Sequence, residues 1–228
     1  MNTFTLDKVV PWGRSFEEYV SMFSLTGKDL LLDILGCADG PSSFNRELTE
    51  RGGRAISVDP LYQFTKTQIA RRINDVYDEV LEQTRKNRDD YVWDNIRSVE
   101  ELGRIRMSAM QGFLNDYVPG LRCGRYLAGS LPSLPFADGR FQLALCSHFL
   151  FLYSDHLSLE FHISSILEMC RVANEVRIFP LQKLNSEPSS YVEPVLSEFK
   201  KRGYRAEIVN VEYEFQRGSN KMLRIFKL

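Results

Sequence analysis

The residues best suited to ligand chemistry lie in one stretch near the start of the chain, from Gly36 to Asp59. The segment Gly36-Cys37-Ala38-Asp39-Gly40 is made largely of small residues, which allow a ligand to approach the backbone closely. Asp59 stands about 20 residues beyond this segment, where a carboxylate can accept hydrogen bonds from both hydroxyls of a ribose. The spacing therefore predicts a nucleoside-binding turn.

The composition of this turn indicates which kind of nucleoside it can bind. The carboxylate of Asp39 would repel a phosphate, but it would not repel a cationic ligand such as a sulfonium. The turn also lacks the third glycine that the G-x-G-x-x-G pattern provides for binding a pyrophosphate at a helix. Both observations disfavour a dinucleotide.

A β-α-β unit is predicted to position the turn. Residues 30–35 form a short apolar run of the length of a buried parallel strand, and residues 55–58 form a second strand that ends at Asp59. Pro41 suits the first turn of the intervening helix, and Gly52 with Gly53 marks its end. Farther along, residues 126–128 and 141–146 are expected to form the third and fourth strands, with Ser147 and His148 directly after the fourth.

Three segments together resemble the class I S-adenosylmethionine-dependent methyltransferases: LGCADG at 35–40, VDP at 58–60 and LPFADGRFQLALCSHFLFLY at 134–153. The resemblance covers residues 28–228 with one long interruption. It implies an α/β fold, a doubly wound and mostly parallel seven-stranded sheet with a C-terminal antiparallel hairpin. This sequence departs from the family pattern by having Ala38 at the middle glycine, Ile34 at the acidic position of strand one, and Ser130 where an acid often binds the adenine amino group.

The resemblance also implies S-adenosylmethionine as the cofactor and assigns residues to its site. The implied cofactor-binding residues are Gly36, Cys37, Ala38, Gly40, Asp59, Pro60, Leu61, Ser130, Leu131, Cys146 and Ser147. His148 is the best candidate for a general base, because an unperturbed imidazole titrates near neutral pH; Tyr153 is a weaker catalytic candidate. A buried, hydrogen-bonded histidine without a catalytic role is the alternative for His148.

The remaining segments are predicted to form one domain over residues 1–228. Residues 1–28 are expected to form a helical flap, with a capping box at Ser15 and Glu18, whose Trp12, Arg14 and Tyr19 would face the ligand. Residues 63–120 are expected to form a helical cap: a helix at 65–86, a shorter one near 92–99, and a third near 110–117 that ends at Pro119. Stabilising helices without a cap function are the alternative. At the end of the chain, residues 206–213 and 221–228 are predicted to form a hairpin.

The composition limits the classes of partner. With 228 residues and a net charge of −1, the chain lacks the basic excess that is usual for proteins binding nucleic acid or membranes. The four cysteines stand singly and no metal-ligand spacing is present, so we expect no metal site. The N-terminus lacks the pattern of a signal peptide, and a cytoplasmic location is expected.

These observations leave three function hypotheses. The first is an S-adenosylmethionine-dependent methyltransferase that transfers a methyl group in line to a small-molecule acceptor. The second is a catalytically inactive protein on the same fold that binds S-adenosylmethionine or S-adenosylhomocysteine. The third and weakest is a nicotinamide-dependent oxidoreductase. The sequence indicates neither the acceptor nor the oligomeric state.

Overall fold

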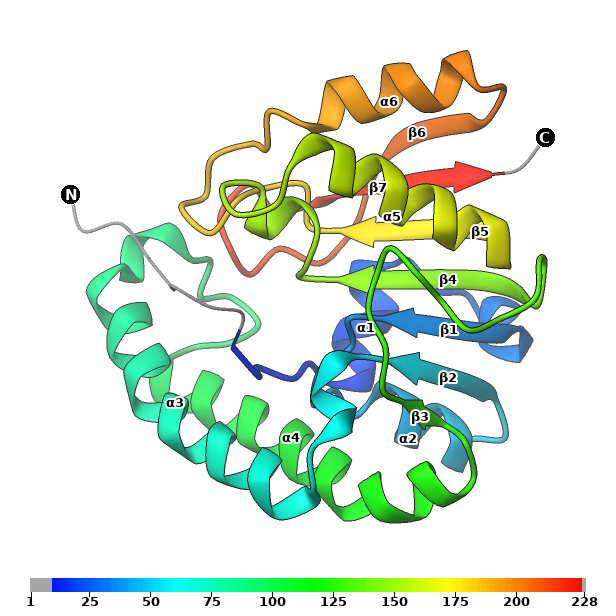
Figure 1. Ribbon diagram of the computed structural model, residues 1–228. Helices are drawn as coiled ribbons and strands as arrows, with labels where there is room; N and C mark the ends of the chain where they lie inside the picture. Colours follow the sequence, from blue (N-terminus) through cyan, green and yellow to red (C-terminus); the bar gives the residue numbers. More distant parts are fainter. Residues whose placement is uncertain (1–9, 227–228) are drawn as a thin grey trace.

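The computed structural model of the protein describes residues 10–226, and its centre is a seven-stranded sheet (Figure 1). The strand order is β3-β2-β1-β4-β5-β7-β6, with parallel pairing from β3 to β5 and antiparallel pairing of β7 with both its neighbours. The strands are β1 (Asp33–Cys37), β2 (Arg54–Val58), β3 (Tyr126–Leu127), β4 (Phe141–Ser147), β5 (Ala173–Phe179), β6 (Arg205–Asn210) and β7 (Lys221–Phe226). The predicted fold class, including the C-terminal antiparallel hairpin, is confirmed.

Helices cover both faces of the sheet, as a doubly wound fold requires. The α-helices are α1 (Phe16–Met22), α2 (Phe44–Glu50), α3 (Lys66–Lys86), α4 (Val99–Arg122), α5 (Leu159–Val172) and α6 (Val192–Lys201). Alternate residues of β1 point to opposite faces: Leu35 belongs to the apolar cluster beneath α5 and α6, and Ile34 to the one beneath α1 and α2. A third cluster, which includes Phe113 and Tyr117, packs α3 and α4 beside β3.

The first strand begins later than the apolar run predicts. Residues Asp29–Leu31 form a 3₁₀ turn, and β1 starts at Asp33. The Asp29 carboxylate accepts hydrogen bonds from the backbone and hydroxyl of Thr26, both 2.8 Å, and pairs with Arg177 at 3.1 Å. These interactions hold the chain in a turn and leave the Leu31 side chain 71% exposed.

The helical insert contains two long helices where three were predicted. The segment from residue 91 to 97 is irregular, since the Val92 N–H donates to the Phe215 carbonyl at 2.8 Å instead of closing a helical turn. The side chain of Ser98 then caps α4 by accepting from the Glu101 N–H at 3.1 Å. Pro119 does not end α4; the helix continues for three residues and closes with the Cys123 N–H on the Pro119 carbonyl, 3.0 Å.

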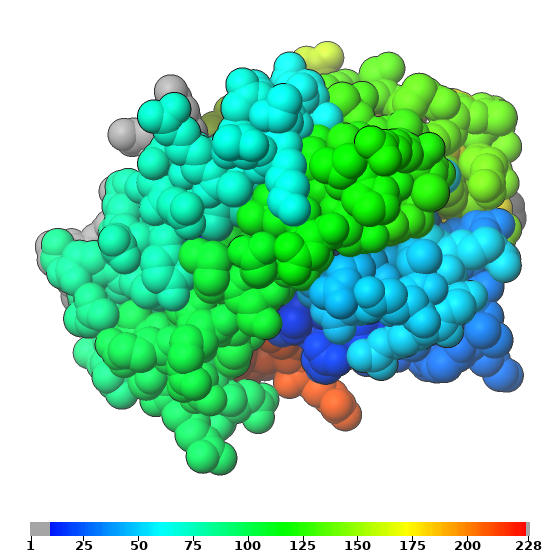
Figure 2. Space-filling model, turned by 90° about the horizontal axis from the view of Figure 1, so that it is seen from below, coloured from blue at the N-terminus to red at the C-terminus, as the bar shows by residue number. Residues whose placement is uncertain are grey.

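The two long helices pack along each other and extend past the carboxyl ends of the central strands (Figure 1). Seen from below, their cyan and green atoms form a continuous surface that reaches the light-blue segment containing α2 (Figure 2). The connection between β6 and β7 is also longer than the predicted tight turn. It reaches back to the insert, where the Arg217 N–H donates to the Asp90 carbonyl at 2.8 Å. The segment between α3 and α4 therefore meets the connection between β6 and β7 at the carboxyl edge of the sheet.

Candidate functional site

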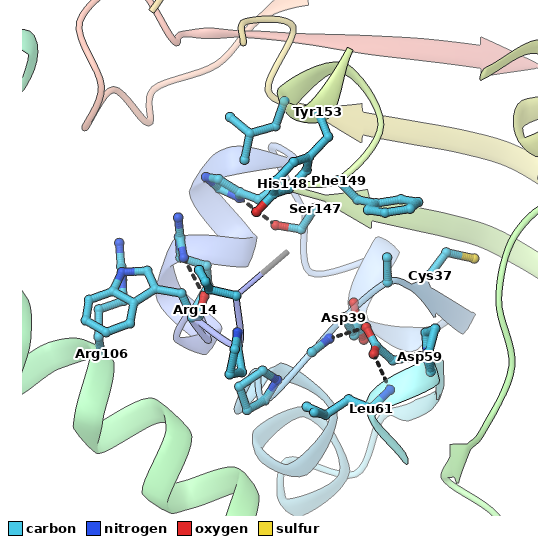
Figure 3. A pocket seen from close by; sticks show the side chains of 18 of the residues that line it. Arg14, Cys37, Asp39, Asp59, Leu61, Arg106, Ser147, His148, Phe149 and Tyr153 are labelled. Carbon is cyan, nitrogen blue, oxygen red and sulfur yellow. Dashed lines mark hydrogen bonds between the residues drawn. The ribbon is translucent and has the colours of Figure 1, made fainter. Parts of the chain in front are cut away.

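A cavity of about 670 Å³ lies at the carboxyl edge of the sheet (Figure 3). It opens where β1 lies between β2 and β4, which is the point where the strand order reverses and where open α/β sheets bind ligands. Every residue that the sequence nominated for the site lines this cavity except Gly36 and Cys146. Trp12, Arg14 and Tyr19 of the N-terminal segment also line it.

Gly36 and Cys146 lie behind the cavity wall. A Cβ atom on Gly36 would fall 1.8 Å from Oδ2 of Asp39, so the Asp39 carboxylate occupies the space above this glycine. Cys146 is completely buried in β4, and burial raises the pKa of its thiol to about 12. Gly36 thus serves the internal packing of the turn, and Cys146 is a small core residue.

Asp39, whose charge the sequence analysis considered but which was not among the implied cofactor-binding residues, is a buried carboxylate in the cavity wall. Its Oδ1 accepts from the Tyr19 hydroxyl at 2.8 Å and its Oδ2 from the Ser57 hydroxyl at 2.6 Å. Burial raises the pKa of Asp39 to about 6, although both hydroxyls favour the ionised form. By contrast, Asp33 of β1 lies at the opposite end of the strand and pairs with Arg54. The carboxylate near the carboxyl end of β1 therefore belongs to Asp39 of the turn and not to a residue of the strand.

The turn itself is held in a left-handed conformation. Ala38 has a φ angle of 54° and Gly40 one of 53°. The Ala38 N–H donates to the Val58 carbonyl at 2.9 Å, and the Gly40 N–H donates to Oδ2 of Asp59, also at 2.9 Å. The Tyr62 hydroxyl donates a hydrogen bond to the Gly40 carbonyl at 2.8 Å. These bonds join the turn after β1 to the segment after β2.

Asp59 joins the two turns and also faces the cavity. Its second oxygen accepts from the Leu61 N–H at 2.7 Å, at the start of the 3₁₀ turn Pro60–Gln63. Burial raises the pKa of Asp59, while these two backbone donors oppose the shift. A carboxylate offers about four lone-pair directions, so two remain for ligand hydroxyls. Beyond β3, Ser130 is exposed at the cavity and Leu131 is buried beneath it.

The segment after β4 contributes Ser147, His148 and Tyr153. His148 has a φ angle of 51°, and its N–H donates to the Phe179 carbonyl at 2.7 Å. Its Nδ1 lies 2.8 Å from the Ser147 hydroxyl. Burial, with the neighbouring charges of Arg14 and Arg106, lowers the pKa of His148 well below its ordinary value. The imidazole is therefore neutral at physiological pH.

The other two histidines are placed differently. Both ring nitrogens of His162 are within hydrogen-bond distance of backbone carbonyls, Ser158 at 2.8 Å and Leu150 at 2.9 Å, so His162 is structural. His156 is exposed and does not line the cavity. Among residues 10–226, no group of three or more His, Cys, Asp or Glu side chains is arranged to hold a metal ion.

Two arginines lie on the other side of the cavity, and the sequence analysis singled out only Arg14. Gly13 packs against the Pro41 carbonyl so tightly that a Cβ atom there would fall 2.1 Å from its oxygen, and Arg14 follows directly and lines the cavity. Arg106 of α4 is fully buried, pairs with Glu18 and lies 3.4 Å from the Tyr213 hydroxyl, which donates to Glu18 at 2.9 Å. In the sequence, Arg106 stands on the otherwise apolar stripe of its helix, and this position was the signal that its side chain is buried.

Both long helices of the insert border the cavity. The insert residues that line it are Phe64, Gln68, Ile69, Arg72, Val80, Thr84, Tyr91, Leu102 and Arg106. The connection between β6 and β7 adds Tyr213, Phe215, Gln216 and Ser219. The insert therefore encloses one side of the cavity. None of the helices within residues 10–226 has the length and apolar character needed to cross a membrane.

Comparison with known proteins finds a relative that matches almost the whole chain. The chain is 33% identical over 228 residues to the uncharacterized protein MJ0045 of Methanocaldococcus jannaschii, and the alignment covers 99% of each chain. No protein-family model matches the sequence.

Several solved structures share the arrangement of elements at low sequence identity. A SAM-dependent methyltransferase from Aquifex aeolicus is 14% identical over 92% of this chain and 87% of its own, with a TM-score of 0.44. Magnesium protoporphyrin IX methyltransferase ChlM from Synechocystis with bound SAM is 12% identical over 93% and 78%, with a TM-score of 0.46. A TehB-like SAM-dependent methyltransferase from Corynebacterium glutamicum is 12% identical over 93% and 87%, with a TM-score of 0.46. Because these identities and TM-scores are low, the function of the chain is inferred from its own residues.

Proposed function

We propose that this chain, which belongs to the same family as Methanocaldococcus jannaschii MJ0045, is an S-adenosylmethionine-dependent methyltransferase that acts on a small molecule. The single observation that carries the proposal is the position of Asp59. Its carboxylate is bonded to the Gly40 N–H, 2.9 Å, and faces a cavity at the point where the strand order reverses. A carboxylate in this position is suited to accept hydrogen bonds from the ribose hydroxyls of a nucleoside.

The charge of the turn favours S-adenosylmethionine over a dinucleotide. Asp39 lies in the wall where a phosphate would approach the backbone of the turn, and its carboxylate would repel the phosphate. The same carboxylate attracts the sulfonium and the α-ammonium group of S-adenosylmethionine. We assign the ribose to Asp59, the adenine to the neighbourhood of Leu61 and Leu131, and the methionine part to the turn that contains Ala38 and Asp39.

The bound cofactor supplies an activated methyl group, and the protein aligns the acceptor with it. With S-adenosylmethionine held there, a lone pair of the acceptor would displace the sulfur from the methyl carbon, and the electron pair of the carbon–sulfur bond would remain on sulfur as a thioether. Holding the two reacting atoms in line can contribute about 7–11 kcal/mol to lowering the barrier. The enclosing insert, which lines one side of the cavity, is assigned the role of excluding water from this step.

We assign His148 the role of general base for an acceptor that arrives protonated. Its depressed pKa keeps the imidazole neutral, and it lies directly after β4 at the cavity. In the tautomer whose Nδ1–H donates a hydrogen bond to the Ser147 hydroxyl oxygen, 2.8 Å away, the lone pair of Nε2 is free to take the acceptor's proton. Tyr153 is assigned a contact with the acceptor, because burial raises the pKa of its hydroxyl and it stays neutral.

The proposal is tested by isothermal titration calorimetry with S-adenosylhomocysteine, NAD and NADP. Binding of S-adenosylhomocysteine alone is the expected result, and binding of either dinucleotide alone would replace the proposal with an oxidoreductase. Catalysis is tested by incubating the protein with methyl-tritiated S-adenosylmethionine and a small-molecule extract, and then counting the label outside the cofactor pool. Binding without transfer from extracts of several sources would favour the catalytically inactive alternative.

A further inference from the structure

We infer, on the basis of the methyltransferase function proposed above, that the methyl acceptor carries an anionic group, a carboxylate or a phosphate, and that Arg14 binds this group. The inference goes beyond the cofactor site to the chemistry of the second ligand. It rests on the distribution of charge in the cavity and on the lack of a counter-ion for one partly buried guanidinium group.

Charges of opposite sign line different parts of the cavity. Its acidic lining residues are Asp39 and Asp59, both at the turns assigned to the cofactor. Its basic lining residues are Arg14, Arg72 and Arg106, two of which come from the insert. Figure 3 shows Arg14 and Arg106 across the cavity from Asp59 and Leu61. A cationic cofactor and an anionic acceptor would each meet charges of the opposite sign.

The arginine side of the cavity has more positive than negative charge. Within residues 10–226, Glu18 is the carboxylate that contacts this group of side chains, and both its oxygens are engaged, one by Arg106 and the other by the Tyr213 hydroxyl at 2.9 Å. Burial opposes ionisation of Glu18, but Arg106 and Arg14 hold its pKa below the ordinary value. Glu18 therefore neutralises one guanidinium group, that of Arg106, and leaves Arg14 without a counter-ion among the described residues.

Arg14 is the guanidinium left without a carboxylate. In the described part of the chain it forms no ion pair, and its one hydrogen bond is from Nη1 to the Trp12 carbonyl at 2.6 Å. Its Nε is buried and has no partner. Arginine stays protonated even where burial and a neighbouring cation lower its pKa, as they do here. A partly buried charge without a counter-ion is unfavourable, and an anionic ligand at the cavity would relieve that cost.

The surroundings of Arg14 fit an acceptor that is a small molecule with an apolar body. Tyr91 of the insert and Phe215 of the connection between β6 and β7 line the cavity, and their rings contact each other with centroids 4.9 Å apart and planes tilted by 31°. Arg14 is close enough to His148 to lower its pKa. An acceptor anchored by its anion at Arg14 would therefore lie beside the proposed base.

The cofactor also carries a carboxylate, so the experiment has to distinguish the two sources of the anion. Binding of S-adenosylhomocysteine and of 5′-methylthioadenosine, which lacks the amino-acid part, is measured for the wild type, Arg14→Gln and the exposed-site control Arg202→Gln. Equal affinities in all three proteins are expected for both ligands. A loss of S-adenosylhomocysteine binding by Arg14→Gln, with 5′-methylthioadenosine unaffected, would assign Arg14 to the cofactor and overturn the inference.

The acceptor side is probed in protein saturated with S-adenosylhomocysteine. Benzoate and phenyl phosphate are compared with the neutral isostere benzamide at constant ionic strength, by calorimetry and by thermal shift. The wild type and Arg202→Gln should bind at least one of the anions and not benzamide, and Arg14→Gln should weaken that binding by about 10- to 100-fold, as expected for a charge-assisted bond. Arg14→Lys, which keeps the charge, should retain part of the affinity.

The failures of the two proposals are distinguishable. If the wild type binds neither anion better than benzamide, or if Arg14→Gln binds them normally, the inference is wrong while cofactor binding stands. If the wild type binds no S-adenosylhomocysteine, the proposed function fails, and the acceptor assignment fails with it even where the anions bind. The comparison of benzoate with benzamide in the wild type does not depend on a variant that folds.

Discussion

The carboxylate of Asp39 occupies the space that a side chain at position 36 would need, with a Cβ on Gly36 placed 1.8 Å from Oδ2 of Asp39. Glycines in such turns are commonly explained by the approach of a ligand. Here a side chain of the protein itself makes the close approach, and Tyr19 and Ser57 hold it there through hydrogen bonds of 2.8 and 2.6 Å. The glycine is therefore required for folding of the site before any ligand enters.

Gly36→Ala should destabilise the protein by roughly 1–3 kcal/mol, the usual cost of overpacking a tight site, because the methyl group displaces the Asp39 carboxylate. The matched control is Gly27→Ala, where an added Cβ has no heavy atom within 4 Å. Urea unfolding measures both. The double variant Gly36→Ala/Asp39→Ala should recover part of the loss, since the displaced group is gone. A stability of Gly36→Ala equal to that of Gly27→Ala would contradict this account.

Ala38→Gly should raise the stability of the protein, whereas Gly36→Ala should lower it. Ala38 has a φ angle of 54°, a conformation that costs an L-residue roughly 1–2 kcal/mol and costs glycine little. Part of this gain is offset by the greater freedom of glycine in the unfolded chain, so a stability change of about 0–1 kcal/mol in favour of the variant is expected. Binding of S-adenosylhomocysteine should be equal or stronger. Urea unfolding and calorimetry check the two parts separately.

The sheet could be predicted because its determinants are local. The apolar runs, the glycine turns and the terminal hairpin each report on a few adjacent residues, and the family resemblance implied a mostly parallel sheet of seven strands. The exceptions also have local causes: the capping interactions of Asp29 delay β1. The cap at Ser98 starts α4 at Val99, so the helix predicted near 110–117 begins earlier and the one predicted near 92–99 is irregular.

The side chains that shape the cavity were harder to predict because their partners are distant in sequence. Arg106 pairs with Glu18 across 88 positions, and the hydroxyl of Tyr213 contacts Glu18 across 195. No short motif encodes such contacts. Asp39 was visible in the turn, but its direction depends on Tyr19 and Ser57, which neither the spacing nor the composition reveals.

Because Asp39 loses its proton as the pH rises, the stability of the protein should fall while its affinity for the ligand should rise. Its pKa is about 6 in the folded protein and 3.8 in the unfolded reference, so between these values the folded state binds the proton and the unfolded state does not. The contribution of Asp39 to stability is therefore fully present below pH 3.8 and is lost as the pH rises through 6, a change on the order of 3 kcal/mol.

Affinity for S-adenosylhomocysteine should instead fall as the pH drops below 6, by up to about tenfold per pH unit, because protonated Asp39 no longer attracts the α-ammonium group. Asp39→Asn should remove both dependences in this range. Urea unfolding and calorimetry from pH 5 to 8, on the wild type and the variant, provide the comparison. Identical pH profiles for the two proteins would show that Asp39 is not the titrating group.

Asp59→Ala should weaken S-adenosylhomocysteine binding by about 1.5–3 kcal/mol, the contribution of a charge-assisted hydrogen bond. The carboxylate also accepts from Gly40 and Leu61, at 2.9 and 2.7 Å, so a smaller loss of stability is expected as well. Asp75→Ala, on the exposed face of α3, is the control for removing a carboxylate. Unchanged affinity in folded Asp59→Ala would remove the ribose assignment.

His148→Asn should abolish most of the turnover while leaving cofactor binding intact. Asparagine is the substitution of choice, because His148 has a φ angle of 51° and asparagine tolerates this conformation better than most residues. Loss of a general base is expected to lower kcat by about 10²- to 10⁴-fold for an acceptor that must lose a proton. Transfer of tritiated methyl from S-adenosylmethionine measures kcat, calorimetry with S-adenosylhomocysteine measures the cofactor site, and the exposed His156→Asn is the matched control. Full activity of His148→Asn would mean that the acceptor reacts without a base on the protein, and that His148 serves to hold the turn after β4 through its 2.7 Å bond to the Phe179 carbonyl.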